Sequence, residues 1–114
     1  MRDMGIEDKL CKFIKEFGDD LNSLELLLFF SRHPNARFNR TAVLHSVTSK
    51  RFDTAVTLKR LIDRNIIVTY SENGVVLYGL TKDEPDHSLA AELVSIDQNR
   101  WQIILEYILD AHEI

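Results

Sequence analysis

Apolar residues recur every three or four positions over the first third of the chain, a spacing that indicates amphipathic helices. The first predicted helix covers residues 6–17, and its apolar face is made of Ile6, Leu10, Phe13, Ile14 and Phe17. Gly18 and the Asp19–Asp20 pair follow this face, and residues of these types commonly end a helix. We therefore expect the first helix to stop near Gly18.

A second helix is predicted through the most apolar run of the chain, LELLLFF at residues 24–30. Ser23 stands directly before this run and is the expected N-cap. His33 precedes Pro34, and a residue before proline avoids helical backbone angles, so the helix should end there. Because so little of this helix is polar, we expect it at the centre of the core.

A short third helix is predicted over residues 40–47, with Asn39 as its N-cap. Phe38 and Val43 stand on either side of the cap at the spacing of a hydrophobic staple. This pair would fix the angle at which the chain enters the helix.

A fourth helix, over residues 50–64, follows after a very short connection. Thr48 or Ser49 is its expected N-cap, and Asn65 its expected end, because asparagine tolerates the left-handed backbone found there. Two short helices joined in this way make a helix-turn-helix.

Residues 66–80 have the pattern of two strands joined by a tight turn. Residues 66–71 and 75–80 are rich in β-branched and aromatic side chains, and Asn73–Gly74 between them accepts positive φ at both positions. A hairpin that directly follows a helix-turn-helix is expected to fold back beside it as a wing.

The chain from about residue 85 to residue 114 has a helical pattern. Its apolar positions at helical spacing are Leu89, Ala90, Leu93, Val94, Trp101, Ile104, Leu105, Ile108 and Ala111. Ser95 with Gln98 three residues later fits a capping box, which would break the segment near Ile96. The sequence leaves open whether this segment is one helix or two.

The composition is that of a globular protein with one domain. The 114 residues are 45% hydrophobic and 28% charged, enough for one core and too few for two. No apolar run approaches the ~18 residues of a membrane span, and the first residues, MRDMGIEDK, lack the apolar stretch of a secretion signal. A single cysteine, Cys11, makes no internal disulfide. These features predict a cytoplasmic protein with no membrane partner.

Charge is distributed unevenly along the chain, although its net value is only -4. Residues 31–70 hold eight of the fourteen lysines and arginines against Asp53 and Asp63, a net charge of +6. The remaining residues hold six basic and sixteen acidic side chains, a net charge of -10. A basic middle between acidic ends is typical of a polyanion-binding face on an otherwise acidic protein. Chance variation in surface charge is the alternative.

The segment TAVTLKRLIDRNIIVTYSENGVVLYGLT, residues 54–81, resembles the winged-helix transcription regulators of the MarR and ArsR type. The likeness lies in the leucines at Leu58 and Leu61, the turn at Asn65, the apolar pair after it, and the closing group of Tyr78, Leu80 and Thr81. It extends over about residues 21–81. The resemblance implies an α+β, mainly α, fold: a winged helix-turn-helix with a two-stranded β-hairpin wing and additional N- and C-terminal helices.

The same resemblance implies how the chain is organised. One domain would span residues 1–114, with an N-terminal helix in 1–20, a winged-helix core in 21–81 and a C-terminal helical dimerisation segment in 82–114. A homodimer would form through the terminal helices and insert the two copies of helix 50–64 in successive major grooves, roughly 34 Å apart. The residues assigned to dimerisation are Trp101, Ile104, Tyr107, Ile108 and Ala111. Alternatively, this segment packs only against its own first helix.

Helical phase separates the core face of residues 50–64 from the face available to DNA. With Leu58 and Leu61 inward, the outward residues are Phe52, Asp53, Val56, Lys59, Arg60, Asp63 and Arg64. The first turn of a recognition helix enters the groove, so Lys50 and Arg51 are the main candidates. Arg51 is assigned to bases because its fork fits guanine, and Lys50 to phosphate.

The full set of predicted DNA contacts is Arg40, Thr41, Thr48, Ser49, Lys50, Arg51, Asp53 and Arg60. The hydroxyl groups and Arg40 suit phosphate oxygens, and Asp53 suits either the helix start or a cytosine amino group. Outward Phe52 and Val56 and the acidic wing tip at Glu72 fit this reading less well. A winged-helix module that binds a protein and not DNA therefore stays open as the alternative function.

No other chemistry is indicated by the sequence. The four histidines, His33, His45, His87 and His112, do not pair with each other or with Cys11 at metal-ligand spacing. There is no glycine-rich phosphate loop, and no serine or cysteine stands in a nucleophile motif. We expect no enzymatic activity, no metal and no cofactor, and a small-molecule effector is left unidentified.

Overall fold

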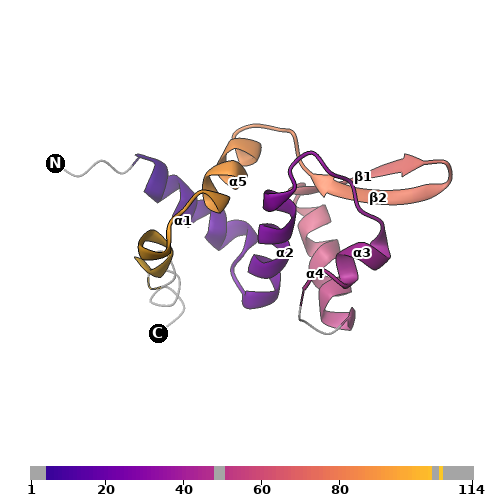
Figure 1. The fold of residues 1–114 in the computed structure, drawn as a ribbon, viewed down its shortest axis with the longest axis horizontal. Coiled ribbons are helices and arrows are strands. Elements are labelled where there is room, and N and C mark those ends of the chain that lie inside the picture. Colours follow the sequence, from indigo (N-terminus) through magenta and orange to yellow (C-terminus); the bar gives the residue numbers. More distant parts are fainter. Residues whose placement is uncertain (1–4, 48–50, 104–105, 107–114) are drawn as a thin grey trace.

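A computed structural model describes residues 5–47, 51–103 and 106 (Figure 1). Its elements run in the order α1 (Gly5–Phe17), α2 (Leu21–Arg32), α3 (Arg40–Leu44), α4 (Arg51–Asp63), β1 (Ile67–Glu72), β2 (Val75–Leu80) and α5 (Asp86–Val94). Residues 98–103 form a further helical segment. The α+β, mainly α, winged-helix layout expected from the sequence is confirmed.

Helix α2 lies at the centre of the molecule, between α1 and α5 on one side and α3 and α4 on the other (Figure 1). Leu26, Leu27 and Phe30 of this helix are fully buried. The central position expected for the most apolar helix is therefore confirmed, and α2 links the terminal helices to the helix-turn-helix.

The start of α2 corrects one prediction. The N-cap is Asp20, not Ser23: the Ser23 amide donates to Asp20 Oδ1 at 2.7 Å, and the backbone of Asp20 is extended. Aspartate is as good an N-cap as serine. Because the helix begins at Leu21, it has an additional turn, and Ser23 is buried at the contact with α4.

Helix α3 is shorter than predicted. Asn39 is its N-cap, as expected, and accepts from the Ala42 amide at 2.8 Å. The helix nevertheless ends at Leu44 and not at residue 47. Ser46 explains this end, because its hydroxyl donates to the Val43 carbonyl at 2.7 Å and satisfies a group that a longer helix would have bonded.

Helix α4 ends in a left-handed residue, as predicted. Asn65 has φ 67, its amide donates to the Ile62 carbonyl at 2.9 Å, and the Ile66 amide donates to the Leu61 carbonyl at 3.2 Å. These two bonds form a Schellman motif. The motif turns the chain directly into β1, whose first residue, Ile67, is buried.

The wing is an antiparallel hairpin in which Ile67 faces Leu80 and Glu72 faces Val75. Asn73 and Gly74 have φ angles of 53° and 80°. Both are positive, as this tight turn requires. Phe38 adds a short bridge to the outer edge of β2, because its amide and carbonyl both bond to Tyr78. This bridge was not predicted, and it anchors the start of α3 to the wing.

The C-terminal segment is interrupted, which decides between the two alternatives. Helix α5 ends at Val94 with Ser95 as its C-cap, and helical structure resumes at residue 98. Asp97 caps the second piece, since its Oδ1 accepts from the Arg100 amide at 2.9 Å. The break thus falls near Ile96, but the capping residue is Asp97 and not Ser95.

Candidate nucleic-acid interface

The inner face of α4 is buried in the way that helical phase predicts. Thr54, Leu58 and Leu61 are each 1% exposed, and Ala55 and Ile62 are half-buried. Thr57 is also buried, which the assumed phase did not place inward. The helix packs against α2, α3 and β1, so three elements fix its position.

The outer face of α4 is open to solvent. Asp53, Lys59 and Asp63 are exposed, and Val56 exposes 50% of its surface. Arg51 begins the helix, although its side chain and that of Phe52 lie outside the described residues. Three further predicted contacts, Thr48, Ser49 and Lys50, also lie outside them.

The first turn of α3 lies beside this outer face and carries two predicted contacts, Arg40 and Thr41, both exposed. A groove of about 490 Å³ runs between α3, α4 and β2; its lining is Arg40, Ala55, Val56, Leu58, Lys59, Ile62 and Tyr78. The fold therefore brings Arg40 and Lys59, which are far apart in sequence, to one groove. Its floor is apolar and its charged groups are cationic.

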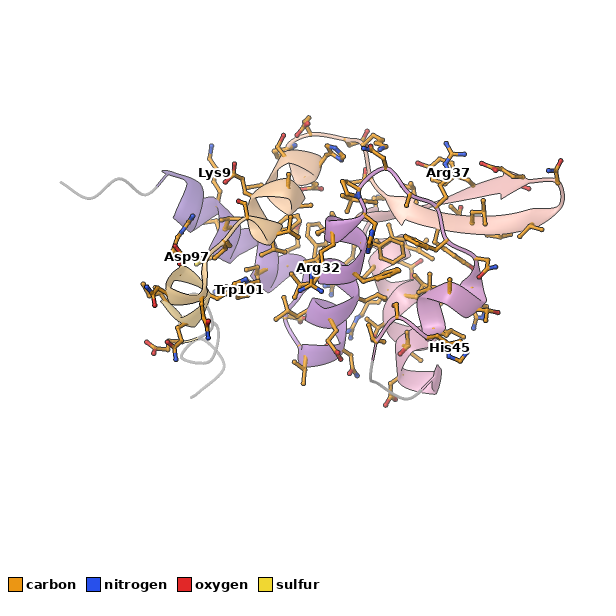
Figure 2. All side chains as sticks on the ribbon, in the orientation of Figure 1. Lys9, Arg32, Arg37, His45, Asp97 and Trp101 are labelled. Carbon is orange, nitrogen blue, oxygen red and sulfur yellow. The ribbon has the colours of Figure 1, made fainter. Side chains whose placement is uncertain are left out.

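The wing holds a cluster that the sequence analysis missed. The Arg37 guanidinium lies over the Tyr70 ring, 3.8 Å from its centroid, and pairs with the Glu72 carboxylate. Figure 2 shows Arg37 beside the hairpin. The alternation of Tyr70 and Glu72 places them on one face of β1, but Arg37 joins them only through the fold. Glu72, the acidic residue of the wing, is thus neutralised within the protein.

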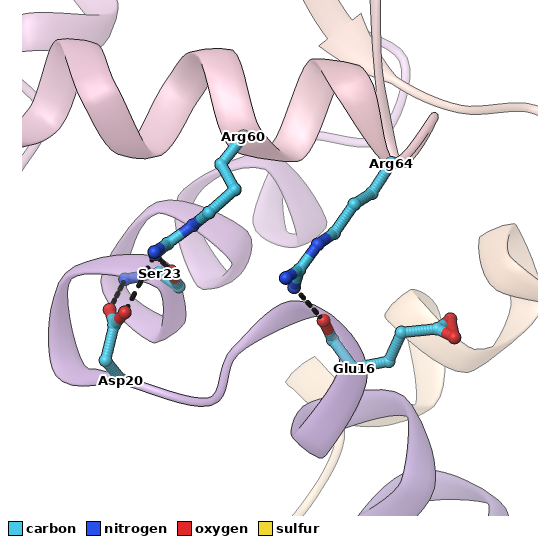
Figure 3. Close-up of polar contacts among 5 residues, drawn as sticks. All are labelled: Glu16, Asp20, Ser23, Arg60 and Arg64. Atoms are coloured by element: carbon cyan, nitrogen blue, oxygen red, sulfur yellow. Dashed lines mark hydrogen bonds and ion pairs between the residues drawn. The ribbon is translucent and has the colours of Figure 1, made fainter.

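Arg60 is not where the sequence analysis placed it. Its side chain points across to the start of α2, where Nη2 donates to Asp20 Oδ2 at 2.8 Å and to Ser23 Oγ at 2.7 Å (Figure 3). The prediction that Arg60 faces outward is corrected, because an acceptor pair from α2 lies within reach of its long side chain. Arg60 is therefore left out of the surface proposed below.

The carboxyl group of Asp20 is shared between two elements. Burial opposes its ionisation, but the hydrogen bonds from the Ser23 amide and from Arg60 outweigh burial and hold the pKa of Asp20 below its ordinary value. The carboxylate consequently stays charged at neutral pH, capping α2 with one oxygen and binding Arg60 with the other.

Other basic side chains of the middle segment also have partners within the protein. Arg64 donates to the main-chain carbonyl of Glu16 (Figure 3). Lys59 pairs with Asp63 at 3.2 Å, and both groups are so exposed that this pair holds Lys59 only weakly. The positive charge that faces solvent along the groove therefore comes from Arg40 and Lys59.

The residues assigned to dimerisation are only partly described. Trp101 is half-buried, packs against the core and lies on the side of the molecule away from the wing (Figure 2). Ile104, Tyr107, Ile108 and Ala111 lie outside the described residues. Ile103, which the sequence analysis did not single out, exposes 64% of its surface.

The described residues contain no group of three or more His, Cys, Asp or Glu side chains arranged to hold a metal ion. Among the helices of the same residues, none is long and apolar enough to cross a membrane.

The order of helices, helix-turn-helix and hairpin defines a winged-helix protein. No family model matches the sequence, and no curated protein matches it. Among solved structures, the chain is similar to the heme sensor protein PefR, crystallised in complex with heme and carbon monoxide. The TM-score is 0.51 at 15% identity, with 94% of this chain and 70% of PefR covered. At this identity the likeness supports the fold alone.

Proposed function

We propose that the protein is a sequence-specific DNA-binding transcription regulator of the MarR/ArsR type that acts as a homodimer. Each copy would insert α4, preceded by residues 48–50, in a major groove. The observation that carries this proposal is the open outer face of α4, which no other described element covers and which adjoins Arg40 and Thr41 of α3. A recognition helix needs such a face, and phosphate groups need the flanking cation.

The predicted contacts have different roles. Arg40 and Thr41 at the start of α3, with Thr48, Ser49 and Lys50, would bind phosphate oxygens and set the register. Arg51 would read a guanine through its two-pronged guanidinium. Val56 is well placed to contact a thymine methyl group, since its exposed side chain is apolar. Asp53 would cap the helix start or accept from a cytosine amino group.

Fluorescence anisotropy with a labelled duplex at a series of salt concentrations tests the proposal. The wild-type protein should bind at low salt, and log K should fall linearly with log salt concentration. Arg40→Ala should reduce the steepness of that line by about 0.9, the value for one lost phosphate contact. Lys50→Ala should weaken all duplexes alike, whereas Arg51→Ala should relax the preference at one base pair by about 1–3 kcal/mol.

Arg32→Ala is the matched control for Arg40→Ala. Arg32 is exposed, belongs to the same basic segment and ends α2, outside the groove. The Arg32→Ala variant should leave the salt dependence of DNA binding nearly unchanged. Equal effects of the two variants, or no binding by the wild-type protein at low salt, would rule out DNA binding by this face.

The second candidate function is binding of a protein partner through the same face. The apolar floor of the groove and the exposed side chain of Val56 favour it. Under this alternative no duplex binds at any salt concentration. Val56→Asp would then abolish binding of the partner without changing stability.

A small-molecule effector has a candidate site in the groove between α1 and α5. This groove has a volume of about 510 Å³, with Phe13, Phe17 and Leu89 as its apolar part. Burial, followed by the nearby carboxylates of Glu16, Asp83 and Glu84, raises the pKa of Asp86 at its edge. Lys9 and Lys12 line the same groove, so its charged groups have both signs. We therefore propose an apolar ligand and assign it no charge.

The heme bound by PefR does not fit that groove. Heme iron is held in proteins by histidine, cysteine, methionine or tyrosine. None of these residue types lines the groove among the described residues. No role for heme is therefore proposed.

A further inference from the structure

Two arginines connect α4 and its C-terminal end to the turn between α1 and α2. Arg60 lies in the last turn of α4, and Arg64 follows directly after the helix, with its amide still bonded to the Arg60 carbonyl at 3.1 Å. Figure 3 shows both side chains extending in the same direction, toward Asp20, Ser23 and Glu16. Neither side chain lines the α3–α4–β2 groove.

The Arg60 contact joins α4 to the first turn of α2. The guanidinium binds Asp20 and Ser23 at 2.8 and 2.7 Å, and the side chains of Arg60 and Asp20 are 39% and 47% exposed. Asp20 is itself fixed, because its second oxygen accepts from the Ser23 amide at 2.7 Å. The acceptor is therefore oriented before Arg60 reaches it, which makes the contact geometrically specific.

The Arg64 contact joins the end of α4 to the end of α1. The Glu16 carbonyl belongs to the last turn of α1, where main-chain acceptors have no helical partner, and the Arg64 guanidinium donates to it. Packing of its inner face against α2, α3 and β1 fixes where α4 lies. The contacts of Arg60 and Arg64, one turn apart, add two directional restraints on its tilt toward α1 and α2.

We propose that Arg60 and Arg64 are positioning residues that set the orientation of α4 relative to α2, and thereby the affinity and selectivity with which the outer face of α4 binds duplex DNA. This inference rests on the proposed function. The two arginines act through the position of the helix and do not contact DNA.

The opposite role is that Arg60 is a DNA contact held back by Asp20. The two roles predict opposite changes in DNA affinity for Asp20→Asn, a substitution that removes one negative charge. Asparagine is as good an N-cap as aspartate, so the start of α2 is preserved. If Arg60 were a sequestered DNA contact, the variant would bind DNA more tightly. If Arg60 positions α4, the variant binds DNA more weakly despite its more positive charge.

The experiment compares DNA binding by wild type, Asp20→Asn, Arg60→Gln, Arg60→Lys and Arg64→Gln in the anisotropy assay. We expect Asp20→Asn, Arg60→Gln and Arg64→Gln to weaken binding roughly threefold to tenfold, the effect of losing one hydrogen-bonded contact on an equilibrium. Arg60→Lys should recover part of the loss, because it keeps a donor for Asp20. Tighter binding by Asp20→Asn would overturn the proposal.

Two controls separate positioning from unfolding and from simple loss of charge. Thermal melts by circular dichroism must show each variant folded at the assay temperature. Arg32→Gln removes the same charge at the exposed end of α2, outside the groove, and its salt dependence gives the effect of charge alone. Arg60→Gln should leave the steepness of the salt dependence unchanged, since Arg60 contacts no phosphate.

A readout without DNA keeps this inference distinct from the proposed function. Residual dipolar couplings of backbone amides report the tilt of α4 relative to α2. Asp20→Asn and Arg60→Gln should change the couplings of α4 relative to those of α2. The couplings within α2 should still fit a single helix orientation. Unchanged couplings would overturn the positioning role even if DNA binds. A change of tilt in a protein that binds no duplex would instead refute the proposed function and retain the positioning role.

Discussion

Asn65 shows how one residue joins α4 to the wing. Its positive φ closes the Schellman motif, and the following residues, Ile66 and Ile67, are fully buried. A left-handed backbone conformation costs free energy for residues that have a β-carbon, and the cost is smallest for asparagine. Glycine has no β-carbon and does not pay this cost. The identity of residue 65 therefore affects stability without any side-chain contact.

We predict that Asn65→Ala lowers the free energy of unfolding by about 1 kcal/mol, the cost of placing alanine in left-handed backbone. Asn65→Gly is the matched variant, and it should leave stability unchanged or slightly higher because its backbone accepts the same angles. Urea unfolding followed by circular dichroism measures both. Equal destabilisation by alanine and glycine would show that the asparagine side chain, and not the backbone angle, is responsible.

Asp20 gives the protein a defined response to acid. Its pKa in the folded protein lies below the ordinary value, so the folded state favours the ionised carboxylate. The resulting stabilisation is present above the ordinary aspartate pKa and is lost as the pH falls through the lowered folded value. Protonation would break the bond to Arg60 but leave an acceptor oxygen for the cap.

The corresponding prediction compares the melting temperatures of wild type and Asp20→Asn across pH. Wild type should melt higher at about pH 6, and the difference should shrink as the pH falls below the ordinary aspartate pKa toward the lowered folded value. Thermal melts at a series of pH values measure this. A difference that stays constant with pH would mean that the carboxylate charge of Asp20 contributes nothing.

At the scale of elements, α3 depends on its cap. A helix of five residues is too short to be stable by itself, so Arg40–Leu44 is held by the Asn39 cap, the buried Val43 side chain and the bridge at Phe38. Because Arg40 and Thr41 form its first turn, the same cap orients the proposed phosphate contacts.

We predict that Asn39→Ala costs about 1 kcal/mol of stability, the usual effect of removing an N-cap, and also weakens DNA binding. Asn39→Ser is the matched control, because serine supplies an acceptor oxygen at the same position. Urea unfolding and the anisotropy assay measure the two effects. Loss of stability with unchanged DNA binding would separate α3 from the proposed interface.

Local signals in the sequence predicted the elements well because they act over a few residues. The periodicity of α2, the Asn39 cap, the Asn65 end and the Asn73–Gly74 turn all have this character. The N-cap of α2 was assigned to Ser23, which directly precedes the apolar run, whereas the helix begins three residues earlier with Asp20 as its cap.

The contacts that the sequence did not reveal join distant residues. Arg60 binds Asp20, which lies forty residues earlier, and Arg37 binds Glu72, which lies thirty-five residues later. Helical phase predicts an outward Arg60, because phase depends only on the axis of one helix. A long flexible side chain can still reach an acceptor on a neighbouring element, so the fold and not the local pattern decides which charges face solvent.

At the scale of the whole molecule, internal pairing divides the basic middle segment. Arg37, Arg60 and Arg64 bind groups within the protein, while Arg40 and Lys59 line the exposed groove. The positive charge available to a polyanion is therefore smaller than the +6 of residues 31–70 suggests. A single copy would bind DNA weakly, and two copies bound together would combine their affinities.

The proposed dimer gives the last prediction. Ile103 exposes 64% of its surface on the helical segment that also carries Trp101, so it is available to contact a second copy in the proposed dimer. Sedimentation equilibrium should give twice the chain mass of 13.2 kDa for wild type. Ile103→Glu should shift the equilibrium to the monomer, because a buried unpaired carboxylate opposes association.

Gln102→Glu adds the same charge at an exposed neighbouring residue and is the matched control. It should leave the protein dimeric if the effect of Ile103→Glu comes from burial and not from net charge. A monomeric Ile103→Glu should also lose most of its DNA affinity, since each copy would bind with one groove alone. A wild-type protein that stays monomeric at high concentration would instead place the apolar C-terminal residues against their own chain and remove the two-site geometry from the proposed function.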